Sequence, residues 1–371
     1  MFVSGRFAPI RRKMQCARQQ TVSPLRLPIP STVSTYSRTL TELRAEPRTW
    51  LITGVSGFIG SHLLETLLQH GQRVVGLDNF STGSPRNLDD VQARVSAEEW
   101  ARFTMRQGSV VDIGACRDAC QQVDFVLHQA GFVSVPLSIE DPVACHDTNV
   151  TGTLNVLLAA RDNGVRRVVY ASSSAVYGDD ERMPKIEAQI GRPLSPYGAS
   201  KLIGEMYARQ FLDHYGLESV GLRYFNIFGP RQNVDGGYAA VIPQWIAALL
   251  RGEAGRVHGD GTATRDFCPV ENVVQANLLA ATTRQPGVPG EIYNVALGAR
   301  IDLNALYAAI SSRVATRTPL PPQHGPPRAG DILHSGADIA KIERDLGFVP
   351  EVSVGQGLDE TVRWYADAAR G

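Results

Sequence analysis

Short apolar segments and segments with helical periodicity alternate along the chain from about residue 50. The apolar segments have the length of buried strands and comprise residues 50–53, 73–77, 123–128, 167–171 and 220–224. Apolar side chains recur at helical spacing in residues 58–70, 146–163 and 197–215. Strands that are apolar throughout and alternate with helices predict an α/β fold, a parallel sheet with helices on both faces.

The pattern becomes irregular after Phe228. Stretches rich in Gly and Pro separate shorter helical patterns at residues 229–237, 252–261 and 318–330. Residues 290–295 are predicted to form one further strand, and residues 301–315 a helix. We therefore expect a smaller, irregular C-terminal domain that lies over the carboxyl edge of the sheet.

Residues 1–46 differ in composition from the rest of the chain. They contain eight Arg or Lys residues and no acidic residue before Glu42, and they show no sustained apolar period. We predict a disordered extension, or an upstream start codon with Met14 or a later site as the alternative start. An Arg-rich organelle transit peptide is a further alternative, although Pro24, Pro28 and Pro30 would interrupt an amphipathic helix.

Composition narrows the possible partners and compartments. Lys plus Arg equals Asp plus Glu, 37 each, so no net field draws the protein to nucleic acid or to a membrane surface. No apolar run approaches the roughly 18 residues that span a bilayer. The five cysteines contain no C-x-x-C pair, which favours a reducing compartment and predicts no metal site; Cys116 and Cys120 are interpreted as packing residues. These features predict a soluble, cytoplasmic protein.

A glycine motif follows the first predicted strand. Residues 53–60 read Thr-Gly-Val-Ser-Gly-Phe-Ile-Gly and lead into the first predicted helix. Such glycines allow a tight turn and let the backbone approach a diphosphate at the helix N-terminus. Asp78 ends the second strand, where its carboxylate can accept from both ribose hydroxyls and repel a 2′-phosphate, so a Rossmann-type site for NAD rather than NADP is predicted. The alternative is a glycine-rich turn and a surface Asp.

A second group of polar residues follows the strand at residues 167–171. Ser173 lies in a run of three serines, and Tyr197 and Lys201 are four residues apart at the start of a predicted helix, hence on one face. An ammonium beside a phenol is expected to lower the pKa of the phenol towards neutrality. Tyr197 would then take a proton from a sugar hydroxyl that Ser173 holds by a hydrogen bond. Alone, the Tyr–Lys pair would be read as an aromatic anchor beside a surface lysine.

Together these residues resemble the extended short-chain dehydrogenase/reductase superfamily. From about Thr41 onward the chain is similar to its UDP-sugar 4-epimerase branch, and most similar to bacterial UDP-N-acetylglucosamine 4-epimerases of surface-polysaccharide pathways. The stretches that carry the resemblance are residues 53–60, 77–80, 128–131, 223–226, 259–261 and 265–267, with Ser173, Tyr197 and Lys201.

The resemblance implies a role for individual residues. The predicted NAD-binding residues are Gly54, Gly57, Phe58, Ile59, Gly60, Asp78, Asn79, Ser109, Val110, Gln129, Ala130, Tyr197, Lys201 and Tyr224. The predicted substrate-binding residues are Ser134, Ser173, Ser174, Asn226, Tyr238, Ala240, Val241, Arg265, Arg328, Asp331 and Ser335. Asn226 and Arg265 would hold the diphosphate, although a surface ion pair with Asp266 is an alternative role for Arg265. Arg328 and Asp331 would lie near the uridine, and residues 238–243 would cover the uracil.

The resemblance also divides the chain. Residues 47–228 and 270–297 would form the NAD-binding domain, and residues 229–269 and 298–371 the substrate domain. The family pairs two helices of each subunit in a four-helix bundle, so a homodimer through residues 146–163 and 197–215 is expected, although either helix could pack on the sheet instead.

One position bears on the sugar. In these enzymes the residue four after a Gly-Asp pair controls the room for the C2 substituent: tyrosine restricts the pocket to UDP-glucose and UDP-galactose, and a small residue admits N-acetyl. Here that residue is Ser335, which predicts acetamido sugars. Four departures concern fine preference: Ser109 stands where Asp is frequent, Gly131 where Ala is usual, and Val133 and Leu137 differ from common residues near the sugar.

The implied reaction is epimerisation at C4. Tyr197 would take the O4 proton as hydride passes from C4 to NAD, and the 4-keto sugar would turn before both return. The alternatives are a UDP-glucose or UDP-glucuronate 4-epimerase, and a 4,6-dehydratase or decarboxylase, which would need acidic residues where Ser174 and Ala175 stand. A non-catalytic NAD-binding sensor is the remaining alternative.

Overall fold

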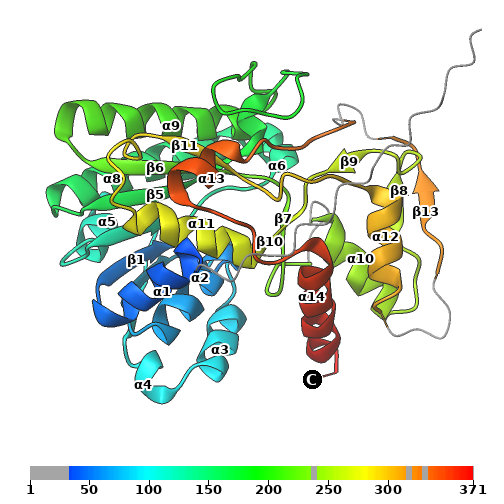
Figure 1. The fold of residues 1–371 in the computed structure, drawn as a ribbon, viewed down its shortest axis with the longest axis horizontal. Helices are drawn as coiled ribbons and strands as arrows, with labels where there is room; N and C mark the ends of the chain where they lie inside the picture. Colours follow the sequence, from blue (N-terminus) through cyan, green and yellow to red (C-terminus); the bar gives the residue numbers. More distant parts are fainter. Residues whose placement is uncertain (1–32, 235–239, 315–319, 328–332, 371) are drawn as a thin grey trace, which may run out of the picture. The chain divides into compact units, whose positions relative to one another are not determined.

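The computed structural model describes residues 33–234, 240–314, 320–327 and 333–370. The chain divides into two units, Met1–Val33 and Ser34–Gly371. All the helices and strands labelled in Figure 1 belong to the second unit.

A parallel sheet forms the centre of this unit (Figure 1). Its strands are β1 (Thr49–Thr53), β2 (Arg73–Asp78), β3 (Phe103–Gln107), β4 (Phe125–His128), β5 (Arg167–Ser173), β6 (Glu218–Tyr224) and β11 (Ile292–Val295). They run in the order β11-β6-β5-β4-β1-β2-β3, and every neighbouring pair is parallel. The order reverses between β1 and β4, which is where doubly wound sheets open a binding crevice.

Helices cover both faces of the sheet, as the hydrophobic pattern predicted. One apolar cluster packs α1 (Thr35–Ala45), α2 (Phe58–Gln69), α11 (Val270–Thr282) and α13 (Ala340–Leu346) against the sheet, with α3 (Pro85–Arg94) and α4 (Ala97–Trp100) at its side. The opposite cluster packs α5 (Ile113–Ala119), α8 (Gly152–Asp162) and α9 (Pro196–Tyr215), and includes the buried Cys116 and Cys120. The predicted Rossmann-type α/β class is therefore confirmed.

The C-terminal part has its own apolar cluster, built on α10 (Val241–Leu250), α12 (Leu303–Ser311) and α14 (Val354–Ala368). Trp245 and Tyr307 meet edge to face at its centre. Short strand pairs surround it: β7 (Ile227–Phe228) with β10 (Cys268–Pro269), β8 (Arg256–His258) with β13 (Gln323–Gly325), and β9 (Thr264–Arg265) with β12 (Ile301–Asp302). This agrees with the smaller, irregular C-terminal region that was expected.

Two predicted elements differ from the structure. The prediction of a disordered extension was wrong for Thr35–Ala45, which form α1. Ser34 caps this helix, and the buried Leu43 packs in the core. Its apolar stripe is too short to stand out in the sequence. The helix predicted for residues 301–315 starts only at Leu303. Asp302 caps this helix, and Ile301 and Asp302 form β12, which pairs with β9.

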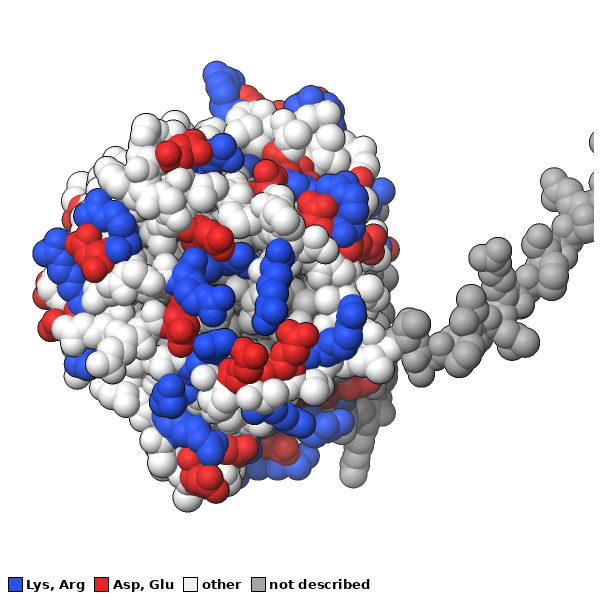
Figure 2. All heavy atoms as spheres, turned by 60° about the vertical axis from the view of Figure 1, so that its left-hand side comes forward, with Lys and Arg blue, Asp and Glu red and all other residues white. Residues whose placement is uncertain are grey.

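Charges on the described surface are mixed in sign. Figure 2 shows Lys and Arg interspersed with Asp and Glu on one face, without an extended patch of either sign. No helix in the described ranges is long and apolar enough to cross a membrane.

Candidate active site

A cavity of about 2080 Å³ opens beside the carboxyl ends of the central strands. All the predicted NAD-binding residues line it. Of the predicted substrate-binding residues, it is lined by Ser134, Ser173, Ser174, Asn226, Ala240, Arg265 and Ser335. Val241 instead packs against the C-terminal apolar cluster, and Tyr238, Arg328 and Asp331 lie outside the described residues.

The glycine motif forms a close-packed cradle between β1 and α2. Gly54 adopts a left-handed φ of 72°, and a Cβ on it would lie 2.7 Å from the backbone nitrogen of Ala130. A Cβ on Gly60 would lie 2.1 Å from the carbonyl oxygen of Gly54. Gly57, at the N-cap of α2, provides no side-chain cap. The first-turn N–H groups of α2 therefore remain available to a diphosphate, so the cradle fits NAD.

Asp78 is held in place by the backbone around it. One carboxylate oxygen accepts from the Ser56 N–H at 2.9 Å and the other from the Phe80 N–H at 2.8 Å, where Phe80 has a left-handed φ of 58°. A carboxylate oxygen offers two lone pairs, so each retains an acceptor site for a ribose hydroxyl. This is the arrangement that the NAD prediction requires.

Three side chains beside the cavity form a closed ring of hydrogen bonds. The Tyr224 hydroxyl donates to Gln129 Oε1 at 3.0 Å and accepts from Asn277 Nδ2 at 2.9 Å, while Gln129 Nε2 donates to Asn277 Oδ1 at 3.0 Å. Burial raises the pKa of Tyr224, so this phenol stays protonated. Asn277, buried in α11, was not predicted because its partners lie far away in sequence.

The three predicted catalytic side chains lie together. Ser173 ends β5 and is hydrogen-bonded to Tyr197, which lies in the first turn of α9. One turn later, Lys201 Nζ donates to the carbonyl oxygen of Ala171 at 3.0 Å and lies 5.9 Å from the centroid of the Tyr197 ring. The Tyr197 N–H donates to Ser138 Oγ at 3.1 Å, which fixes the start of the helix.

The expected lowering of the Tyr197 pKa is not found. Burial raises the pKa of Tyr197, and its hydrogen bond with Ser173 opposes this only in part. Burial also lowers the pKa of Lys201 to about 8. The prediction was wrong because it counted the ammonium charge and omitted the desolvation of the phenol. Positive charge in the cavity therefore has to favour the phenolate before Tyr197 can act as a base.

Replacing Lys201 with methionine is expected to move the pH dependence of turnover. A base must lose its proton to act, so activity rises with pH through the pKa of Tyr197, and loss of the nearby cation moves that rise to higher pH, by about one unit. The pH profile of kcat/KM measures the shift. Lys341→Met is the matched control, because Lys341 also lies over a tyrosine ring, that of Tyr293, away from the cavity. An unchanged profile in Lys201→Met would contradict the expectation.

A π-helical turn at Asp147–Thr151 interrupts the helix predicted for residues 146–163, between α7 (Pro142–His146) and α8. It directs Asn149 towards the active site: Oδ1 accepts from the Phe132 N–H at 2.7 Å, and Nδ2 donates to the Phe132 carbonyl at 3.0 Å and to Ser200 Oγ at 2.9 Å. Asn149 therefore ties the loop after β4 to the helix that carries Tyr197 and Lys201. An asparagine in an apparently continuous helix gives no signal of this role.

A buried ion pair supports the serine cluster. Arg223 donates from Nε and Nη2 to the two carboxylate oxygens of Glu205, at 2.9 and 2.8 Å, and both side chains are 3% exposed. Ser172 donates to the same carboxylate at 2.5 Å. Paired charge-assisted bonds of this kind fix geometry, so the end of β5 that carries Ser173 is held rigidly.

At the far end of the cavity the predicted diphosphate residues come together. Asn226 has a left-handed φ of 38°, and its Nδ2 donates to the Asp266 carbonyl at 3.0 Å. Arg265 Nη1 donates to the Leu333 carbonyl at 3.1 Å, and the Ser335 N–H donates to the Thr264 carbonyl at 3.0 Å. The Asp266 carboxyl is fully buried and accepts from the Leu297 N–H at 2.9 Å, which excludes a surface ion pair with Arg265.

Comparison with known proteins places this geometry in a family. Residues 50–296 match the model of the NAD dependent epimerase/dehydratase family. The chain belongs to this family. The predicted family, the NAD cofactor and the assignment as an enzyme are thereby confirmed.

Members of the epimerase/dehydratase family match nearly full length. The UDP-glucose 4-epimerase of Mycolicibacterium smegmatis is 35% identical over 322 residues, 86% of this chain and 99% of the relative. A UDP-N-acetylglucosamine 4-epimerase from Methanobrevibacter ruminantium M1, solved in complex with UDP-N-acetylmuramic acid, has a TM-score of 0.80 at 35% identity and covers 87% of this chain and 99% of its own. A Thermus thermophilus UDP-glucose 4-epimerase solved with NAD has a TM-score of 0.75 at 32% identity, with coverage of 86% and 99%.

Asp266 gives this family member a pH-dependent stability. Burial raises its pKa from 3.8 to about 6, against N–H groups that lower it. The stability that goes with the raised pKa is complete below pH 3.8 and is lost as the pH rises through about 6, which amounts to at most about 3 kcal/mol. Asp266→Asn is expected to remove this loss, as measured by thermal unfolding below and above the window. The exposed Asp213→Asn is the control; equal pH dependence in wild type and Asp266→Asn would contradict the assignment.

Proposed function

We propose that the protein is an NAD-dependent UDP-sugar 4-epimerase that interconverts UDP-N-acetylglucosamine and UDP-N-acetylgalactosamine. The observation that carries the proposal is one continuous cavity, lined by the NAD cradle at Gly54–Gly60, by Ser173, Tyr197 and Lys201, and by Asn226, Arg265 and Ser335. Relatives at 35% identity that bear the names of UDP-sugar 4-epimerases support it.

The side chains divide the work of the reaction. Tyr197 takes the proton from the sugar O4 and later returns it to the same oxygen, after the sugar has turned its other face. Ser173, which lowers the pKa of the phenol by hydrogen bonding, would also hold the sugar O4. Lys201 supplies positive charge beside the phenol. NAD, which the glycine cradle and Asp78 would hold, would supply reversible hydride chemistry at C4, so no external oxidant would be consumed.

The substrate end must hold the nucleotide while the sugar turns. Arg265 and Asn226 line the cavity near one another and offer donors to a diphosphate, for which the planar guanidinium is well suited. Anchoring only this part lets the keto sugar rotate about its diphosphate link and present its other face to the nicotinamide. The large volume of the cavity is consistent with such a rotation.

Ser335 supports an acetamido sugar. Its small side chain lines the cavity, and its neighbour Gly336 is buried against Arg300 and Met183. A larger residue at position 335 would project into the volume that a C2 substituent needs. UDP-glucose and UDP-glucuronate are the alternative substrates.

The rival activities have less support. A 4,6-dehydratase or decarboxylase needs acidic groups beside the catalytic hydroxyl, whereas Ser174 and Ala175 begin a 3₁₀ turn there. A non-catalytic NAD-binding sensor would not need the Ser–Tyr–Lys set, which is complete and assembled.

We also propose that the enzyme forms a homodimer and acts in the cytoplasm. Met206, Tyr207 and Tyr215 of α9 are exposed on one helix, as expected of a surface that pairs with a second copy. Light scattering would give the mass in solution. The four described cysteines are free and buried, in keeping with a reducing compartment.

The test is an epimerisation assay without added NAD. Purified protein is incubated with UDP-N-acetylglucosamine and, separately, with UDP-glucose, and the anomeric proton signals are followed by NMR. The galacto epimer is expected chiefly from the acetamido substrate, which would also show that NAD stays bound. Turnover of UDP-glucose alone would keep the epimerase and reject the acetamido preference, and no turnover of any UDP-sugar after addition of NAD would reject the function.

A further inference from the structure

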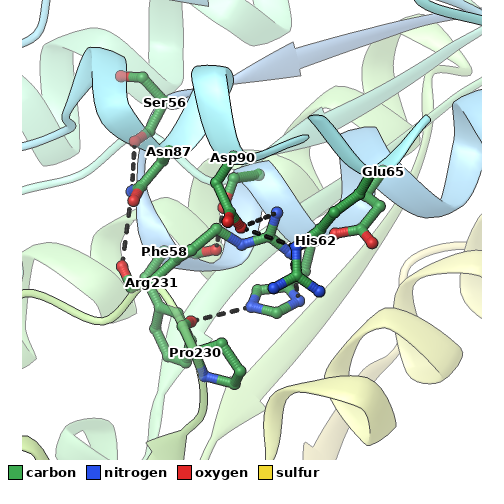
Figure 3. Close-up of polar contacts among 10 residues, drawn as sticks. Ser56, Phe58, His62, Glu65, Asn87, Asp90, Pro230 and Arg231 are labelled. Carbon is green, nitrogen blue, oxygen red and sulfur yellow. Dashed lines mark hydrogen bonds and ion pairs between the residues drawn. The ribbon is translucent and has the colours of Figure 1, made fainter. Parts of the chain in front are cut away.

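A buried arginine outside the catalytic set lies in the turn that follows β7. Arg231 follows β7, lines the cavity, and has a side chain that is 2% exposed. Its Nη2 donates to Glu65 Oε2 at 2.6 Å and to His62 Nδ1 at 2.9 Å, and its Nη1 lies 3.5 Å from Asp90 Oδ2. Figure 3 shows the guanidinium among these side chains. One arginine thus joins the turn after β7 to helices α2 and α3.

His62 holds the same turn through its backbone. Burial and the neighbouring Arg231 charge lower the pKa of His62 well below its usual range, so the ring is neutral. Because Nδ1 accepts from Arg231, the proton lies on Nε2, which donates to the Pro230 carbonyl at 3.0 Å. Two consecutive residues of the turn are therefore fixed to α2 by a single side chain (Figure 3).

The network continues into the NAD cradle. Asn87 Nδ2 of α3 donates to the Ser56 carbonyl at 2.9 Å and lies 3.5 Å from the Arg231 carbonyl. Ser56 belongs to the glycine motif, and its N–H donates to the Asp78 carboxylate. Phe58, in the first turn of α2, meets the His62 ring edge to face at 5.8 Å. Asn87 and His62 therefore contact both Arg231 and residues of the glycine motif.

The other end of the turn leads to the substrate side. Asn226 lies five residues before Arg231 and lines the cavity, and so does Gln232 directly after it. Gln232 Nε2 donates to the Ile227 carbonyl at 3.2 Å, and its carbonyl accepts from the Tyr365 hydroxyl of α14. A shift of Arg231 would therefore move both Gln232 and the backbone that carries Asn226.

The backbone conformation at Arg231 indicates that the surrounding contacts determine where this residue lies. Its φ of 64° is left-handed, a conformation that a residue with a long side chain adopts only when its surroundings determine it. Arg231 Nε has no hydrogen-bond partner among the described residues, although the side chain is buried. A simple structural ion pair would require neither feature, since an arginine with ordinary φ could reach Glu65 from the surface.

We propose that Arg231 is a positioning residue that couples the dinucleotide cradle to the diphosphate end of the substrate site. Filling of one end stabilises the turn from Asn226 to Gln232 in the geometry that the other end requires, so each ligand strengthens the binding of the other. This inference rests on the proposed function, in that the cavity takes NAD and a uridine diphosphate. Coupling of this kind keeps the C4 atom in register with the nicotinamide while the sugar turns.

The test measures coupling without requiring turnover. Holoenzyme is mixed with isotopically labelled NAD, and the exchange of bound for labelled NAD is followed with and without saturating UDP. UDP is expected to slow exchange in the wild type by about tenfold, a typical size for coupling between sites. In Arg231→Met the slowing is expected to fall below about twofold. Arg94→Met is the matched control, because Arg94 pairs with the same Asp90 from α3 without holding the turn, and it should retain the wild-type ratio.

His62→Phe guards against a variant that fails to fold. It keeps a ring against Phe58 and the Glu65 partner of Arg231, but removes the hydrogen bonds of His62 to Arg231 and to the Pro230 carbonyl, so it is expected to reduce the UDP effect as well. The inference is overturned if Arg231→Met and His62→Phe keep the wild-type ratio, or if UDP does not slow exchange in the wild type. A wild type in which UDP slows exchange but which epimerises no UDP-sugar would instead defeat the proposed function alone.

Discussion

Replacing Tyr197 with phenylalanine is expected to lower kcat by about 10³-fold while NAD stays bound. The change removes one hydroxyl and keeps the ring that packs at the start of α9. That hydroxyl is the group whose pKa Ser173 lowers by hydrogen bonding, and general base catalysis by a positioned group contributes roughly 10²- to 10⁴-fold. The NMR assay gives the rate, and the NAD released on denaturation gives the occupancy.

A second tyrosine provides the control for this change. Tyr307 is buried in the C-terminal cluster, and its hydroxyl accepts from the Gly255 N–H at 3.1 Å, far in sequence from the catalytic residues. Tyr307→Phe removes an equivalent hydroxyl and is expected to leave kcat within a few-fold of the wild type. Near-full epimerase activity in Tyr197→Phe would show that another group moves the proton, and the mechanism proposed here would be abandoned.

Replacing Ser335 with tyrosine is expected to change the substrate. The Ser335 N–H is bonded to the Thr264 carbonyl, so the backbone is held and a bulky ring has to enter the cavity. The ring would occupy the space for the C2 substituent, and kcat/KM for UDP-N-acetylglucosamine should fall by about 10²-fold, within the range that steric rejection in a pocket achieves. For UDP-glucose it should change by only a few-fold. Both values come from initial rates in the NMR assay.

Ser312→Tyr is the matched control, because Ser312 is exposed at the end of α12 and does not line the cavity. An equal loss with both sugars would mean that the ring blocks the pocket as a whole. No loss with either would mean that position 335 lies outside the path of the sugar. Either result would remove the basis for assigning an acetamido substrate.

The parts of the site that could be predicted are those encoded by short spacings. The glycines of the cradle and Asp78 follow directly from two strand ends, and Tyr197 and Lys201 share a face because they are one helical turn apart. Parallel strands bring their carboxyl ends to one edge of the sheet, which explains why these groups meet in one cavity. The sheet itself was predictable because its strands are apolar throughout.

The remaining parts depend on contacts between distant segments. Asn277 is hydrogen-bonded to Gln129, which lies 148 positions earlier in the sequence. Glu205 of α9 pairs with Arg223 of β6, and the two come together only when α9 packs against that strand. Nothing local marks either residue. The direction of the Tyr197 pKa was missed for the same reason, because burial is a property of the assembled structure and not of the Tyr-x-x-x-Lys spacing.

Helix α1 packs its buried Leu43 into the same apolar cluster as residues of α11, which begins about 225 residues further along the chain. A ribosome that adds roughly 5–20 residues per second needs about 10–45 s to make that stretch. During this time the nascent helix has no α11 to cover it. The first described helix of the protein therefore gains the cover of α11 only after most of the chain has been synthesised.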